Sequence, residues 1–159
     1  SGTEIFFKCE NFQKMGAFKM RGATNAILQL SDERKKAGVV THSSGNFAQA
    51  LSLAAKNLGV KAYIVMPENA PQVKKEAVKG YGGIITESES TPIARETEAD
   101  RIQKETGATF IHPSNDPLKL NCPILSKMVM KLSCRLSSAS VLLREYLRQI
   151  PKRTSEYLR

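Results

Sequence analysis

The stretch Val39-Val40-Thr41-His42-Ser43-Ser44-Gly45-Asn46 is typical of a short β-branched strand followed by a polar turn that opens a helix. Apolar residues recur at helical spacing from this turn to residue 58, and Gly59 then gives a stop signal. The next run, 62–66, is almost wholly apolar (AYIVM), which is typical of a strand buried on both sides. Strand, helix and strand in this order predict one unit of a parallel sheet.

The same alternation extends along the chain in both directions. Short β-branched or apolar runs predict strands, and periodic apolar positions between glycine and proline breakers predict helices. Strands are expected over 4–9, 39–42, 62–66, 84–86 and 110–112, helices over 18–30, 46–58, 71–81 and 91–105, and a polar connector over 11–17. This alternation requires a parallel sheet with helices on both faces, so the predicted fold class is α/β. Ligands of such sheets bind at the carboxyl ends of the strands, where the 43–46 turn lies.

Composition narrows the class of protein. The 159 residues, 41% of them hydrophobic and 25% charged, are enough for one soluble domain with a sizeable core. We expect a cytoplasmic protein, because no run approaches the ~18 apolar residues of a membrane span and no secretory leader is visible. Three widely spaced cysteines fit neither a disulfide framework nor a zinc knuckle, and two histidines are too few for a His-rich metal site. No metal ligands are therefore predicted.

The charge is concentrated at one end of the chain. Residues 1–118 hold 15 Lys and Arg against 13 Asp and Glu, whereas residues 119–159 hold 9 against 2. Glycine is absent after residue 118, and two amphipathic helices are expected over 127–136 and 141–150. A basic tail can bind phosphate non-specifically, but this one lacks interleaved aromatic residues for stacking on bases. Nucleic-acid binding is therefore not expected, and a boundary is predicted near residue 118.

The first candidate for chemistry is Lys19, within Ala17-Phe18-Lys19-Met20-Arg21-Gly22 at the expected start of a helix. A neutral lysine can attack an aldehyde and form a Schiff base. Arg21 is a candidate helper, although residues two apart on a helix point in different directions. The alternative is a solvated lysine beside a surface arginine, and the residues themselves leave both open.

The second candidate is the 43–46 turn. Ser43, Ser44 and Asn46 offer hydroxyl and amide groups, Gly45 lets a ligand approach the backbone, and the following helix directs its N–H groups to the same place. These groups suit a carboxylate. The alternative is an ordinary helix N-cap made by serine and asparagine. His42 is interpreted as a structural histidine at a strand end.

Several motifs together resemble a known family. They are Phe6-Phe7-Lys8-Cys9-Glu10, Phe12-Gln13-Lys14, Gly16-Ala17-Phe18-Lys19-Met20-Arg21-Gly22, the 39–46 stretch, Ala62-Tyr63-Ile64-Val65-Met66-Pro67 and Ile111-His112-Pro113. Over residues 4–117 the chain resembles the serine racemase and serine/threonine dehydratase family, most of all its plant branch. These are fold type II pyridoxal-phosphate enzymes with the tryptophan synthase β-like fold. The resemblance implies a large-domain segment at 1–37, a small α/β domain at 38–117 and a divergent basic tail at 118–159.

The resemblance also implies roles for individual residues. Lys19 matches the lysine that forms a Schiff base with pyridoxal 5'-phosphate and moves the Cα proton, and Phe18 matches the aromatic residue beside the pyridine ring. Ser44 matches the serine on the opposite face of the cofactor. Ser43, Ser44, Gly45 and Asn46 match the loop that grips the substrate carboxylate, and Asn46 also bonds the phenolic oxygen. The implied chemistry is racemisation of serine, or elimination of water from serine or threonine, by a homodimer.

The chain departs from the family pattern in three places. Phe47 stands where the family has histidine, which removes a polar group from the substrate loop. The 159 residues do not reach the family's glycine-rich phosphate loop, the residue facing the pyridine nitrogen or the carboxylates of its Mg²⁺ or Ca²⁺ site. After residue 118 the sequence no longer follows the family. We expect a truncated or mis-spliced member, incomplete by itself. The alternative is a catalytically inactive remnant that acts as a small globular interaction module.

Overall fold

The computed structural model describes residues 9–116. The chain divides into two compact units, Ser1–Cys122 and Pro123–Arg159, and all that follows concerns the first. The strand predicted over 4–9, apart from Cys9, and the helices predicted over 127–136 and 141–150 lie outside the described residues. So do Cys122 and Cys134.

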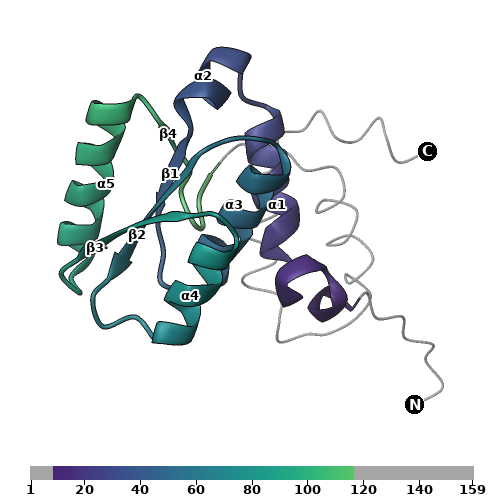
Figure 1. Ribbon diagram of the computed structural model, residues 1–159, viewed down its shortest axis with the longest axis horizontal. Helices are drawn as coiled ribbons and strands as arrows, with labels where there is room; N and C mark the ends of the chain where they lie inside the picture. Colours follow the sequence, from purple (N-terminus) through teal and green to yellow (C-terminus); the bar gives the residue numbers. More distant parts are fainter. Residues whose placement is uncertain (1–8, 117–159) are drawn as a thin grey trace, which may run out of the picture. The chain divides into compact units, whose positions relative to one another are not determined.

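Four parallel strands form one sheet in the order β3-β2-β1-β4 (Figure 1). Val39 pairs with Ala62 on one side and with Thr109 on the other. The strands are β1 (Val39–His42), β2 (Ala62–Pro67), β3 (Ile84–Ser88) and β4 (Thr109–Phe110). The parallel sheet and the α/β class predicted from the sequence are confirmed.

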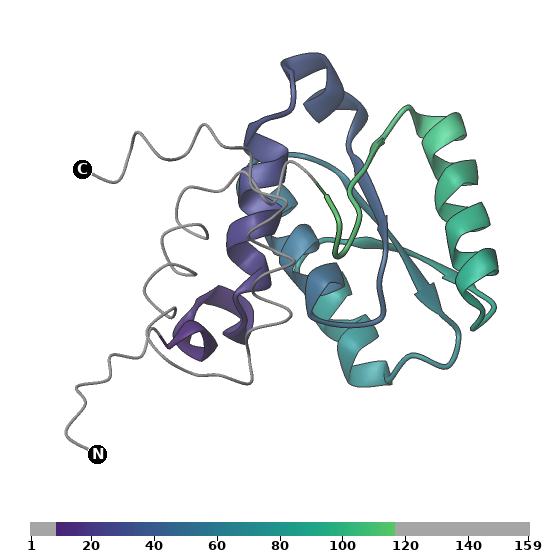
Figure 2. The same cartoon turned by 180° about the vertical axis from the view of Figure 1, so that it is seen from behind.

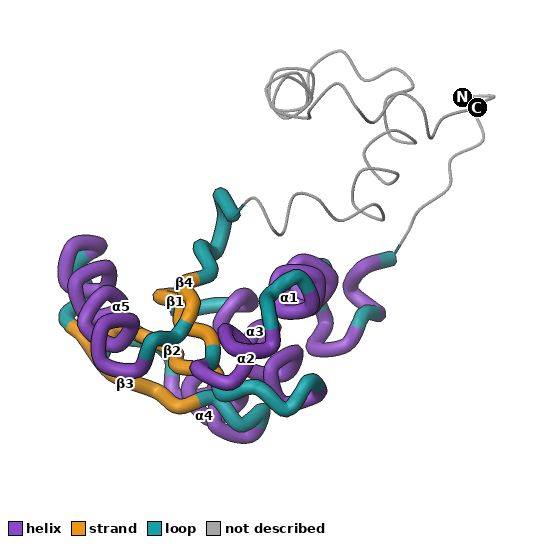
Figure 3. The backbone as a smooth tube through the Cα atoms, turned by 90° about the horizontal axis from the view of Figure 1, so that it is seen from above, coloured by secondary structure: helices purple, strands orange, loops and turns teal. Residues whose placement is uncertain are grey.

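Helices cover both faces of this sheet, and a further helix adds a layer on one side. α3 and α4 lie on one face, α5 lies on the other, and α1 packs on α3 (Figures 1 and 2). Seen from above, the sheet separates α5 from the remaining helices (Figure 3). The helices are α1 (Lys19–Leu28), α2 (Asp32–Ala37), α3 (Asn46–Asn57), α4 (Gln72–Gly80) and α5 (Pro92–Thr106).

The strands bury alternate side chains in two separate cores. Val39, Ile64 and Met66 pack with the α1 and α3 side chains, whereas Val40 and Val65 pack under α5. All five are fully buried. Burial on both faces explains why β2 is a nearly continuous apolar run rather than an alternating one.

Two local features differ from the expected elements. The segment before α1, expected as a plain connector, forms two 3₁₀ turns, Glu10–Phe12 and Lys14–Gly16. The six-residue helix α2 was not expected at all. Among the described residues, no helix is long and apolar enough to cross a membrane.

Candidate active site

The strand order reverses its direction between β1 and β4. The chain moves outward from β1 to β2 and β3 through α3 and α4, and then returns through α5 to β4 on the other side of β1. The helix that leaves β1 (α3) and the helix that leads into β4 (α5) lie on opposite faces of the sheet. In open α/β sheets, ligands bind outside the carboxyl ends of the strands at such a reversal. The two loops there are 43–45 and 111–116.

Lys19 reaches this edge from α1. It is the first residue of α1, and its Nζ donates a hydrogen bond to the carbonyl oxygen of Pro113 at 3.0 Å. Pro113 lies just beyond β4, so the contact joins residues 94 positions apart at the end of the sheet. The lysine predicted at a helix start is thereby placed beside the carboxyl ends of β1 and β4.

Two aromatic rings flank the Lys19 amine. Nζ lies 5.3 Å from the centroid of the Phe18 ring and 6.0 Å from that of Phe47. Phe18 is half exposed, whereas Phe47 is buried in the core between α1 and α3. Phe47, which stands where the family has histidine, thus places an apolar ring next to Lys19.

The 43–46 turn is held by one backbone bond and one bond to the Ser43 hydroxyl, and no side chain caps the helix that follows. The Ser43 N–H donates to the Val65 carbonyl at 3.0 Å, and the Ser43 hydroxyl accepts from the Gly45 N–H at 3.3 Å. Gly45 is the N-cap residue of α3 and makes no side-chain cap bond. Asn46 is the exposed first residue of the helix. The serine–asparagine cap, left open as the alternative, is therefore not what forms.

Gly45 borders open space. A Cβ built at this position meets no atom of the described residues within 4 Å, and its φ of −133° is accessible to other residues. Packing therefore does not account for the missing side chain. The space next to the N-terminus of α3 is therefore available to a ligand, and the positive end of the helix favours an anionic one.

The loop after β4 is fixed by hydrogen bonds that were not predicted from the sequence. The Thr41 hydroxyl donates to the Ile111 carbonyl at 2.7 Å, and the Asp116 carboxylate accepts from the His112 N–H at 3.1 Å. The His112 Nδ1 accepts from the backbone N–H groups of Ser114 and Asn115, at 3.0 and 2.9 Å. These bonds orient the Pro113 carbonyl that holds Lys19. The polar run after Pro113 was the available signal for such a turn.

His42 lies toward α5. Its ring stacks on Phe110 with the centroids 5.5 Å apart and meets His112 edge-on at 5.8 Å. Burial lowers the pKa of His42, and the charges of His112 and Arg95 lower it further, against the raising effect of two α5 carboxylates, Glu96 and Asp100. A stacked imidazole that resists protonation agrees with the interpretation of His42 as structural.

The Arg21 side chain forms an ion pair with Glu10. Its Nε contacts both carboxylate oxygens of Glu10 at 3.0 Å, which ties the first 3₁₀ turn to α1. The alternatives for Arg21 were a helper of Lys19 and a surface charge, and the structure shows instead a partly buried partner of Glu10. Within residues 9–116 no cluster of three or more His, Cys, Asp or Glu side chains could hold a metal ion.

The fold and this site together place the amine of Lys19, in an α/β protein, beside the N-terminus of α3. A ligand that carries an aldehyde and acidic groups would suit such an amine and the positive end of a helix. The family model for pyridoxal-phosphate dependent enzymes matches residues 1–126, and the chain belongs to that family. The resemblance found in the sequence motifs is thereby confirmed.

Individual relatives are similar over the same region. The chain is 56% identical over 115 residues to a serine racemase of rice, covering 72% of this chain and 34% of the relative. It is 54% identical over 117 residues to a beta-hydroxyaspartate dehydratase of Paracoccus denitrificans, covering 74% of this chain and 37% of the relative. The structure of maize serine racemase superposes with a TM-score of 0.76 at 49% identity, covering 82% of this chain and 40% of that one. The chain therefore spans little more than a third of the length of the curated relatives it matches.

Proposed function

We propose that this chain is part of a pyridoxal-phosphate-dependent enzyme that racemises serine or acts as an ammonia-lyase on L-serine or L-threonine. One observation carries the proposal. The Lys19 amine is bonded to Pro113 at the strand-order reversal, in a chain whose relatives are named serine racemase and beta-hydroxyaspartate dehydratase. In the proposal, the amino acid enters at the carboxyl edge of β1 and β4.

The residues at this edge fit pyridoxal phosphate. Lys19 would hold its aldehyde carbon through Nζ, Phe18 would lie beside its ring, and Asn46 would bond its phenolic oxygen. No described atom crowds a Cβ at Gly45, and the Phe18 ring is half exposed. When bound, pyridoxal phosphate withdraws electrons from the substrate Cα and so makes its proton removable.

The chain's own residues would then bind the substrate and move a proton. The Ser43–Asn46 turn would bind the carboxylate through its hydroxyls and the N–H groups at the start of α3. Lys19 Nζ would leave the Pro113 carbonyl and take the Cα proton from one face. Ser44 would return a proton from the opposite face when racemisation is the outcome.

Further parts of the proposal concern the longer protein. We infer a large-domain segment at 1–37 and a small domain at 38–117, joined here by the packing of α1 on α3. A homodimer in the cytoplasm and a Mg²⁺ or Ca²⁺ site belong to the same proposal. Such a cation site would need carboxylates from outside residues 9–116.

The test is selective covalent loading of Lys19. The purified chain is mixed with pyridoxal phosphate, gel-filtered, reduced with borohydride and mapped by peptide mass spectrometry. We expect a visible absorption band and a label concentrated on Lys19, with both lost in Lys19→Ala. A label spread evenly over the exposed lysines would contradict the proposal and favour the alternative of an inactive interaction module.

A further inference from the structure

Phe47 is placed unlike a ligand-binding loop residue. It lies in the first turn of α3, directly after the 43–46 turn, yet its side chain is only 3% exposed. It packs in the core that α1 and α3 share. A ring enclosed in this way cannot swing aside without opening the contact between the two helices.

The same ring contacts the lysine of the site. Lys19 Nζ lies 6.0 Å from the Phe47 ring centroid, within the range of cation–π contacts, and is bonded to the Pro113 carbonyl at 3.0 Å. Phe18 also lies near Nζ, but it neighbours Lys19 in sequence and is 49% exposed. Phe47 is therefore the aromatic wall that the core itself holds fixed.

We propose that Phe47 is a positioning residue for Lys19, which confines the amine between its ring and the Pro113 carbonyl at the edge of the sheet. The proposal rests on the role proposed for Lys19. A lysine side chain has a flexible four-carbon stem and many conformers. A rigid neighbouring ring reduces the number of positions that its amine can take, which helps when the amine must reach one particular atom. A histidine at this position would offer a smaller, polar ring whose nitrogens need partners when buried.

The test measures the reactivity of Lys19 without any cofactor. The folded chain is treated with a limiting amount of acetic anhydride, and acylation of each lysine is quantified by peptide mass spectrometry. The exposed Lys61 and Lys104 serve as internal references in the same sample. In Phe47→Leu, which keeps an apolar side chain but removes the ring, acylation of Lys19 relative to these references should rise about two- to fivefold, the size expected for loss of one cation–π contact. An unchanged ratio overturns the proposal.

A matched variant separates positioning from general loosening of the core. Leu51 is fully buried on α3, one turn beyond Phe47. Leu51→Val should leave the relative acylation of Lys19 unchanged, with thermal melts showing that both variants are folded at the labelling temperature. An equal rise in Leu51→Val would mean that loosening accounts for the effect, and the proposal would fail.

Loading with pyridoxal phosphate distinguishes this proposal from the proposed function. If Phe47→Leu alters acylation but pyridoxal phosphate labels all lysines alike, Phe47 still positions Lys19 and the enzymatic role fails. If pyridoxal phosphate labels Lys19 selectively while acylation ignores Phe47, the enzymatic role stands and the positioning role is wrong.

Discussion

At the scale of single residues, Gly38 and Gly45 lack a side chain for different reasons. Gly38 has a φ of +101°, and a Cβ there would lie 2.9 Å from the Lys61 carbonyl oxygen. Gly45 has an ordinary φ of −133° and open space around it. The first glycine is required by the backbone just before β1, whereas we propose that the space at the second is used by a ligand.

The same substitution should therefore change the stability much more at Gly38 than at Gly45. Gly38→Ala should lower the free energy of unfolding by more than about 1 kcal/mol, through strain and a close contact. Gly45→Ala should change it by less than about 0.5 kcal/mol, because the added methyl group meets no neighbouring atom. Urea denaturation checks both.

Gly45→Ala should also affect substrate binding. In the chain loaded with pyridoxal phosphate, this substitution should abolish the spectral change caused by serine. A retained spectral change would contradict the assignment of this space to the substrate.

His42 gives a prediction about pH. Because its pKa is lowered in the folded chain, chiefly by burial, the unfolded chain binds a proton more readily. Stability should therefore fall as the pH drops below about 6.5, the ordinary histidine value, toward the lowered pKa. In His42→Phe, which keeps a ring against Phe110, the loss of stability between pH 7.5 and 5.5 should shrink by less than about 1 kcal/mol, since solvent screens this half-buried group. An unaltered loss in the variant would contradict the assignment to His42.

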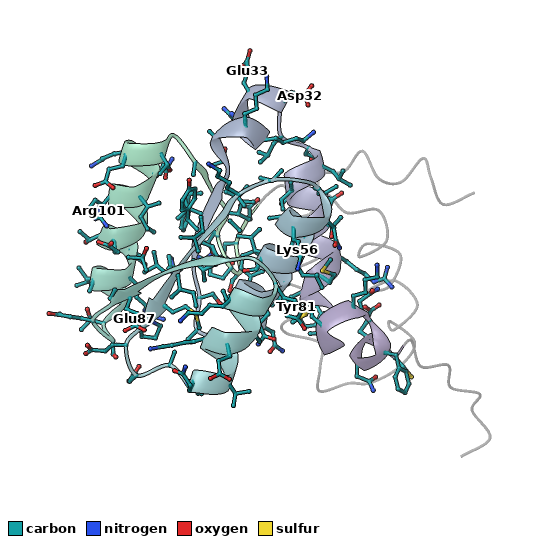
Figure 4. All side chains as sticks on the ribbon, viewed as in Figure 1. Asp32, Glu33, Lys56, Tyr81, Glu87 and Arg101 are labelled. Atoms are coloured by element: carbon teal, nitrogen blue, oxygen red, sulfur yellow. The ribbon has the colours of Figure 1, made fainter. Side chains whose placement is uncertain are left out.

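At the scale of secondary-structure elements, one buried lysine joins α4 to the strands beneath it. Lys75 Nζ donates to the Glu68 carbonyl and to the Glu87 carboxylate, both at 2.8 Å. Glu87 lies on β3, at the edge of the sheet (Figure 4). The hydrogen bond from Lys75 lowers the pKa of Glu87, so this part of the stability is present above about pH 4.5 and is lost as the pH falls through the lowered pKa.

Removing either partner should have unequal effects. Lys75→Ala should cost about 1–3 kcal/mol, because it takes away packing and two hydrogen bonds at once. Glu87→Gln should lower the melting temperature less, since the carboxylate is largely exposed and the Glu68 carbonyl keeps its donor. Thermal unfolding of both variants at pH 7 checks the order, and an equal or larger effect of Glu87→Gln would show that the ion pair dominates.

The elements could be predicted where hydrophobic periodicity marks them. β1 has the bounds that were predicted, and the other strands described within 9–116 differ by one or two residues at their ends. α2 was not predicted because its six residues, Asp-Glu-Arg-Lys-Lys-Ala, have no apolar face. Its signals were local instead, since the Ser31 hydroxyl caps the Arg34 N–H and acidic residues precede basic ones along the helix dipole.

The site could be predicted only in part from the sequence, because some of its contacts depend on the order of the strands. Lys19 at a helix start and the turn after β1 follow from local patterns. The contact between Lys19 and Pro113 depends on the strand order, which puts β4 beside β1 rather than beside β3. That order is set by which face of the sheet each helix covers, and α5, with a mostly charged and exposed surface, gives a weak periodic signal. Phe47 could be recognised as a departure, but its burial against Lys19 could not.

At the scale of the whole molecule, the groups that we assign to pyridoxal phosphate hold only part of it. Lys19, Phe18 and Asn46 would contact its aldehyde carbon, its ring and its phenolic oxygen, and no residue is assigned to its phosphate. A cofactor held by its covalent bond to one lysine, with few further contacts, can pivot. Most of the rate advantage of fixed orientation would then be lost.

The 159-residue chain tested by itself should therefore load pyridoxal phosphate on Lys19 without useful turnover. We expect elimination from serine at least about a thousandfold below the rate of about 10 s⁻¹ that is typical of enzymes. Pyruvate release in a coupled assay and chiral chromatography of serine measure both outcomes, with Lys19→Ala as the background. Turnover above that background at an ordinary enzymatic rate would mean that residues of this chain also fix the phosphate. Phosphate-dependent protection of lysines from acylation would then identify the lysines among them.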